Sequence, residues 1–189
     1  MKTIKKNISK SLNLVGNYRA CFYKQENKIL QKWNDFIIGI MRITNINLKN
    51  LLIFSLQSVD YRKNVICISG MTRLAKALAG KNTNLRETTI NYCALGTGSG
   101  TPTTNDTTLF TESYRNLPGS RESSDNLVYM TAYFTPSETS GTFTEFGTFI
   151  DATATANSGQ LFGKLGSLNW VKDSSTYLLV DIIYTLQTV

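Results

Sequence analysis

The sequence contains no histidine among its 189 residues. Histidine is the commonest general base and metal ligand, so its absence excludes histidine-based catalytic triads and zinc sites with imidazole ligands. Cysteine is scarce as well, because Cys21, Cys67 and Cys93 are odd in number, far apart and without a CxxC pair. A disulfide framework or a cysteine zinc site is therefore not expected, and reduced thiols in a protein made in the cytoplasm are the simpler interpretation.

Long apolar runs are also missing. The longest, Phe36 to Met41 and Leu51 to Leu56, are far shorter than the ~20 residues needed to cross a bilayer. Residues 1–18 carry lysines but lack the apolar stretch that is typical of a secretory signal. We therefore expect no membrane association, and a protein that stays where it is made until it is assembled.

A glycine-rich stretch, "LGTGSG", raises the question of a phosphate-binding loop. A P-loop needs Lys-Ser or Lys-Thr after its last glycine, whereas Gly100 is followed by Thr-Pro. The dinucleotide fingerprint needs its third glycine three residues after the second, but Gly100 lies two after Gly98. Gly96, Gly98 and Gly100 are therefore predicted to shape the exit of a strand, at positive φ or in close backbone contact, and no cofactor is expected.

The net charge of +7 is unevenly distributed. The portion up to Gly70 carries +9 and the remainder carries −2. A basic segment of this kind could contact the phosphates of a nucleic acid or an acidic protein surface. The alternative is a solvated N-terminal segment with no such partner.

Periodicity predicts short helices and a series of strands. Ser69 is a candidate N-cap for a helix that ends at Gly80, and Asp106 is a candidate cap for a second short helix over residues 107–117. Strands are expected at 88–95, 126–134 and 176–188, the last two with one apolar face and one mixed, tyrosine-rich face. This pattern predicts an α+β protein, mainly antiparallel β, with a β-sandwich-like sheet whose outer face is partly covered by helices or neighbouring subunits.

The N-terminal third is harder to interpret. Residues 17–33 alternate around a polar turn at 25–28 and predict a β-hairpin, with Tyr18, Ala20 and Phe22 on one face. Residues 37–64 are ambiguous between strand and helix. We therefore divide the chain into a basic N-terminal arm with a hairpin, residues 1–64, and a folded domain, residues 65–189.

One polar cluster is expected within the strands. Alternation places Glu145 on the side of Phe143 and Phe149, where an unpaired carboxylate would be costly. Arg115, three residues after Glu112, can serve two carboxylates, so Glu112, Arg115 and Glu145 are predicted to form a structural ion pair between helix and sheet. Two carboxylates could also indicate a glycosidase, but no grouping of acid, base and nucleophile is present, and we expect no enzymatic activity.

The order of these elements resembles the N-terminal attachment domain of bacteriophage tail-collar fibre proteins and related small phage virion proteins. The resemblance covers roughly residues 65–189 and rests on order and spacing, since no single element is specific. The matching positions are Ser69-Gly70, Gly96-Thr97-Gly98, Leu109 with Glu112 and Arg115 on a helix, Pro136 with Glu138 and Gly141, and Glu145 with Gly147 and Phe149. Family members often have Asp at the position of Thr97 and Arg at that of Thr144, so contacts made by those side chains do not carry over.

The resemblance implies a structural role in the virion, with Gly141 and Gly147 as further loop-shaping glycines. The expected function is a tail or baseplate component, or an adaptor, that anchors tail fibres as a trimer or a hexamer-related ring. The partners would be fibre, baseplate or neck proteins, and the protein would pass from the host cytoplasm into the tail or neck of the particle. A head-decoration, collar or neck protein remains an alternative, as does a basic nucleic-acid-binding packaging accessory protein.

Overall fold

The computed structural model describes residues 12–188 and shows two packed antiparallel sheets with two α-helices, which confirms the predicted α+β, mainly antiparallel sandwich. The helices are α1 (Lys28–Thr44) and α2 (Ile68–Leu78), with short 3-10 helices η1 (Lys49–Leu51) and η2 (Leu85–Thr88). The strands are β1 (Leu12–Lys24), β2 (Ser55–Lys63), β3 (Val65–Ile66), β4 (Ile90–Gly96), β5 (Glu112–Asn116), β6 (Pro118–Ser124), β7 (Leu127–Phe134), β8 (Gly141–Phe143), β9 (Glu145–Ile150), β10 (Gln160–Leu165), β11 (Trp170–Lys172) and β12 (Thr176–Thr188).

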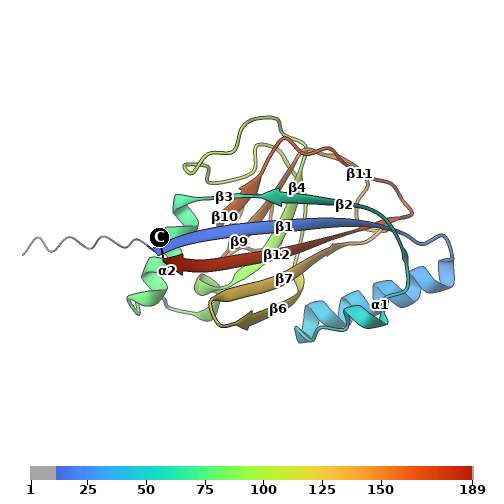
Figure 1. Cartoon of the computed structure of the whole chain (residues 1–189), viewed down its shortest axis with the longest axis horizontal. Coiled ribbons are helices and arrows are strands. Elements are labelled where there is room, and N and C mark those ends of the chain that lie inside the picture. Colours follow the sequence, from blue (N-terminus) through green and yellow to red (C-terminus); the bar gives the residue numbers. More distant parts are fainter. Residues whose placement is uncertain (1–11, 189) are drawn as a thin grey trace, which may run out of the picture.

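The first sheet has the strand order β2-β1-β12-β7-β6, and the second has the order β3-β10-β9-β4-β5. A small pair, β11-β8, lies beside them. The long strands β1 and β12 run antiparallel along the length of the molecule, with Leu12 opposite Thr188 and Lys24 opposite Thr176 (Figure 1). The two helices lie at opposite ends of this long axis.

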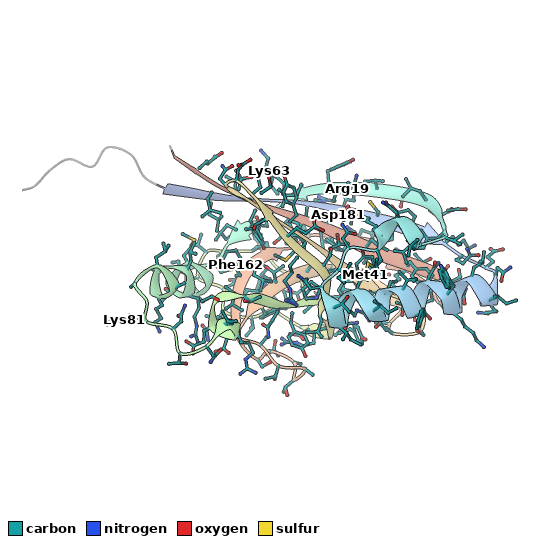
Figure 2. The ribbon with its side chains drawn as sticks, turned by 90° about the horizontal axis from the view of Figure 1, so that it is seen from below. Arg19, Met41, Lys63, Lys81, Phe162 and Asp181 are labelled. Atoms are coloured by element: carbon teal, nitrogen blue, oxygen red, sulfur yellow. The ribbon has the colours of Figure 1, made fainter. Side chains whose placement is uncertain are left out.

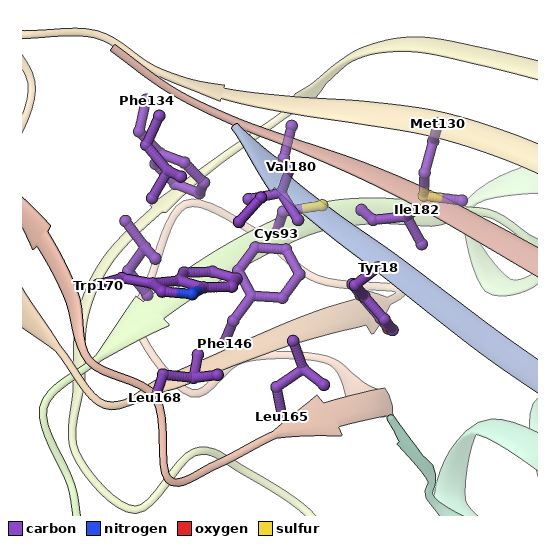
Figure 3. Close-up of a cluster of buried hydrophobic side chains, with 14 of the residues drawn as sticks. Tyr18, Cys93, Met130, Phe134, Phe146, Leu165, Leu168, Trp170, Val180 and Ile182 are labelled. Atoms are coloured by element: carbon purple, nitrogen blue, oxygen red, sulfur yellow. The ribbon is translucent and has the colours of Figure 1, made fainter. Parts of the chain in front are cut away.

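The main core lies between the two sheets. Strands β1, β7 and β12 contribute alternate side chains to it, and the second sheet contributes others (Figure 3). The inner faces expected from period two are confirmed for the last two of these strands, because Met130, Ala132 and Phe134 of β7 and Leu178, Val180 and Ile182 of β12 are all buried there. Burial of this apolar area is the main source of the fold's stability.

A second apolar cluster lies on the outer face of the first sheet, beneath α1. Tyr133, Tyr177 and Leu179 point outward from the sheet and pack against Ile38 and Met41 of the helix. Arg42 anchors the end of α1 through Glu138, with Nη1 2.6 Å from Oε1 and Nη2 3.2 Å from Oε2. The expected coverage of the mixed outer face by a helix is therefore confirmed at one end of the sheet.

The predicted hairpin at residues 17–33 is wrong. Tyr18, Ala20 and Phe22 share the inner face of β1 as expected, but the chain continues into α1 rather than into a returning strand. Asn27 starts this helix, since its side-chain oxygen accepts hydrogen bonds from the backbone N–H groups of Ile29 and Leu30. The undecided residues 37–64 form the rest of α1, η1 and β2.

The division into an arm and a domain also needs correction. β1 lies between β2 and β12 in the first sheet, so residues 12–63 are built into the sandwich. The arm survives as a prediction only for residues 1–11, which lie outside the described residues. The strand β1 is an interior strand of this sheet, since its inner face is apolar and β2 and β12 both pair with it.

The first predicted helix is confirmed and the second is wrong. α2 covers the expected residues, and Gly80, at φ +64°, terminates it. Ser69 is not its cap, because Cys67 takes that position and the Ser69 hydroxyl donates to the Leu161 carbonyl. The segment expected to be helical at 107–117, including the Leu109–Glu112–Arg115 positions of the phage resemblance, forms turns and then β5, which pairs with β4.

Candidate interaction surface

The predicted pairing of Glu112 and Arg115 is confirmed. Arg115 Nε lies 2.5 Å from Glu112 Oε1, and Nη2 lies 2.7 Å from Oε2. Nη1 donates to the Thr153 carbonyl and to the Ser158 hydroxyl, each at 2.9 Å. The guanidinium also lies 4.7 Å from the ring centroid of Phe149. Because every partner is part of β5, β9 or the 153–158 loop, this group fixes a loop to the second sheet.

Glu145 is not part of that group, so the predicted three-residue pairing is wrong. Its carboxylate is fully buried and accepts hydrogen bonds from the backbone N–H groups of Thr111 at 2.7 Å, Phe110 at 2.8 Å and Gly98 at 3.1 Å. Its cation is Lys164, with Nζ 3.5 Å from Oε2. The register explains the difference: Glu145 lies opposite Gly96 of β4.

Arg115 lies opposite Ala94 of the same strand, two positions away from Gly96.

The sequence analysis did not identify Lys164 as the partner of Glu145. It follows Gly163 on the apolar strand β10 and is fully buried, with its Nζ 3.0 Å from Asp106 Oδ2. A lone lysine within an apolar strand could have indicated this ion pair, because a buried ammonium needs a carboxylate partner.

The loop-shaping glycines are held by close contacts. A Cβ on Gly98 would lie 2.4 Å from the Phe110 Cβ and 2.6 Å from Glu145 Oε1. An added Cβ would have its nearest neighbour at 2.6 Å on Gly96 and at 2.9 Å on Gly147, and Gly100 and Gly141 have φ of +157° and +148°. Gly141 alone of the five would leave an added Cβ in near-open space, with its nearest neighbour 3.9 Å away.

A third charged group lies on the outer face of the first sheet, beside α1. Figure 2 shows Arg19 and Asp181 on neighbouring strands, and Arg19 Nη2 is 2.5 Å from Asp181 Oδ2. Lys49 reaches the other oxygen at 2.6 Å. Burial would raise the pKa of Asp181, but the hydrogen bonds from Lys49 and Arg19 outweigh it and lower that pKa. A hollow of about 670 Å³ lies next to this group, with Tyr61 and Tyr129 among its walls.

The strongest candidate for a partner surface is the outward face of α1, here called the α1 stripe. It consists of Ile29, Trp33, Phe36, Ile40 and Ile43, spaced four, three, four and three residues apart. Ile29 is 77% exposed, Phe36 60% and Ile43 86%. The adjoining face of the helix, with Ile37, Ile38 and Met41, is the one that packs on the sheet.

A surface helix normally places polar residues opposite its buried face. α1 keeps a polar side with Lys28 and Lys32, but the α1 stripe leaves apolar residues exposed along the length of the helix, and the segment that follows has exposed Ile46, Leu51 and Ile53. Trp33 is held in place by a hydrogen bond from its Nε1 to the Leu51 carbonyl at 2.9 Å. Contiguous exposed apolar area of this kind marks protein–protein contact sites.

Within the described residues, no helix is both long enough and apolar enough to cross a membrane. The three cysteines are buried and free. No family model matches the chain, and neither the curated proteins nor the solved structures give a significant match to it.

Proposed function

We propose that this chain is a structural protein of a bacteriophage virion, a tail or baseplate component or adaptor that anchors tail fibres through symmetric protein–protein contacts. The observation that carries the proposal is the α1 stripe, because its apolar side chains stay exposed beyond the face of α1 that packs on the sheet and can be buried only by a second partner. The motif order over residues 65–189 resembles that of the attachment domain of tail-collar fibre proteins, and this resemblance supports the assignment to a phage virion.

The spacing of the α1 stripe favours a helical partner. Alternating steps of four and three residues are those of a two-helix seam, in which each apolar side chain inserts between four residues of the facing helix. A second copy of α1 presents the same spacing, so copies of this chain can pair through it. Two copies that pair in this way form a closed dimer, and a trimer would require three copies of α1 to meet around one axis.

The structure gives less support to the nucleic-acid alternative. Several basic residues of the N-terminal portion form ion pairs within the protein: Arg19 and Lys49 with Asp181, Lys24 with Glu26, Arg42 with Glu138, and Arg62 with Asp60. Cations already paired with carboxylates are less available to phosphates. A head-decoration, collar or neck protein remains the nearer alternative, because a symmetric apolar contact serves those positions equally well.

Two measurements test the proposal. The first is mass spectrometry of purified particles of the phage that encodes the chain. We expect the protein in these particles at a fixed ratio to the tail proteins. Its absence from tailed particles, or its presence in isolated heads, contradicts the tail assignment. The second is native mass at low and high salt. Trimers, hexamers or larger rings that persist at high salt support apolar symmetric packing, whereas DNA binding that is lost with added salt supports the packaging alternative.

A further inference from the structure

An apolar cavity of about 480 Å³ opens between the two sheets next to α2. Its volume lies within the range of about 300–1,000 Å³ that small-molecule sites occupy. It lies at the Met130 end of the core cluster, away from Phe134 (Figure 3). Its apolar walls include Leu14, Leu74, Ile90, Val128, Phe162 and Leu186.

Arg121 is the charged group that faces this cavity. On β6 it lies opposite Met130, which belongs to the main core, so the register places Arg121 on the inner face of the first sheet. The residue is partly buried: its Nε is buried and has no acceptor among the described residues, within which the guanidinium also forms no salt bridge. Desolvation by burial lowers the pKa of Arg121, which is the cost expected for a cation in apolar surroundings.

An unpaired guanidinium beside apolar walls is complementary to an anion that carries an apolar tail. A planar carboxylate matches the two parallel N–H donors of an arginine, and an alkyl chain matches the walls. Among residues 12–188, no carboxylate forms a salt bridge with Arg121. Glu122, at the rim, is the next residue on β6 and lies opposite Tyr129, so it belongs to the outer face.

We propose that this cavity binds a single-chain aliphatic carboxylate, with the carboxylate on Arg121 and the alkyl chain between the sheets. The site is separate from the α1 stripe and does not depend on the proposed role in a virion. The bound chain would fill space at the open end of the sandwich and remove the cost of the unpaired cation, so it would stabilise the folded protein.

The test uses the whole chain and decanoate, measured by isothermal titration calorimetry and by thermal unfolding. We expect one decanoate per chain and an increase in Tm, and at least about tenfold weaker binding of decyltrimethylammonium, which has the same tail and the opposite charge. Arg121→Met should weaken decanoate binding at least about tenfold, because it removes the two N–H donors that the carboxylate would accept from.

Two further variants separate binding from folding. Arg62→Met, at an exposed arginine on β2, should leave decanoate binding unchanged. Val128→Phe narrows the cavity without touching the charge and should also weaken binding. The proposal is overturned if decanoate does not bind the wild-type chain, if decyltrimethylammonium binds equally well, or if folded Arg121→Met binds decanoate as tightly as the wild type.

Discussion

Lys164 and Glu145 form an ion pair inside the protein, with Nζ 3.5 Å from Oε2 and neither side chain exposed. Because Glu145 also accepts three backbone N–H groups, it joins β9 to the glycine loop and to the turn before β5. Each of these contacts is strengthened by the negative charge of the carboxylate, so loss of that charge should destabilise the second sheet.

Glu145→Gln is expected to lower the free energy of unfolding by about 3 kcal/mol, because it leaves a buried ammonium less well compensated and replaces an acceptor oxygen by an amide donor. Urea unfolding measures the change. Glu122→Gln, at an exposed position on β6, is the matched control and should change stability by less than about 0.5 kcal/mol. Equal effects of the two substitutions would contradict the role given to Glu145.

Arg115→Met is expected to cost about 3–5 kcal/mol, since Glu112 would keep a buried charge without its cation. Arg115→Lys should not restore stability, because a lysine cannot make the two parallel bonds to Glu112. Arg86→Met, which removes a half-exposed arginine paired with Asp151, is the control and should cost less than about 1 kcal/mol. A stable, soluble Arg115→Met protein with wild-type urea resistance would count against the pairing.

Gly98→Ala and Gly39→Ala are expected to change stability in opposite directions. At Gly98 the new methyl group would overlap Phe110 and Glu145, at a cost of about 1–3 kcal/mol. At Gly39, within α1, it would meet nothing within 4 Å, and the better helix propensity should add about 0.5–1 kcal/mol. Thermal unfolding of the two variants compares them directly, and stabilisation by Gly98→Ala would show that the loop is not confined.

Phe36→Glu tests the α1 stripe. The side chain is exposed in the single chain, so the substitution should leave the Tm of the monomer nearly unchanged while dissociating any oligomer that uses α1. Light scattering at several protein concentrations measures the mass. Leu85→Glu, at an even more exposed apolar residue near α2, is the matched control and should assemble as the wild type does. Dissociation by the control alone would move the contact to the α2 end of the molecule.

Lys172 gives a pH-dependent prediction. Burial lowers its pKa to about 8, and the nearby Glu138 carboxylate opposes this only in part. Between about pH 8 and the unfolded value of 10.5 the unfolded chain binds more protons, so the contribution of this lysine to stability rises with pH. The stability of the wild type relative to Lys172→Met should therefore increase by up to about 3 kcal/mol across that window.

Raised pKa values of the buried Cys67 and Cys93 thiols act in the opposite direction above pH 9, but they are common to the wild type and Lys172→Met and cancel in the comparison. Urea unfolding at pH 7.5, 8.5 and 9.5 measures the difference. A difference that stays constant or falls with pH would show that the ammonium is not desolvated in the folded state.

Sequence reasoning succeeded where one physical period dominated. Alternation in β7 and β12 gave both strands and their inner faces, because each has one wholly apolar side. It failed at α1 because the helix is apolar on two faces, so that the outward Ile29, Trp33 and Phe36 obscured the 3.6-residue period of the buried face. The polar cap at Asn27 was the local signal that was misread as a turn.

The polar sites show the same limit. The Glu112–Arg115 pair could be predicted because the two residues are close in sequence, although the backbone that carries them is a strand rather than a helix. The partner of Glu145 could not, because Lys164 is brought to it only by the pairing of β9 with β10. Arg121 likewise could not be identified from the sequence, because only its register with β7 shows that this charged residue lies on the inner, apolar face of the sheet.

The pairing of β1 with β12 has a consequence for how the chain reaches its native state. Of the strands in the first sheet β1 is made first and β12 last, so the ladder between them cannot close until β12 has been synthesised. Contacts between residues so far apart in sequence slow folding, and until they form, the apolar edges of β1 and β7 are open to other chains. Truncation near the C-terminus should therefore prevent folding of the N-terminal half as well, and rapid synthesis at high concentration should favour aggregation.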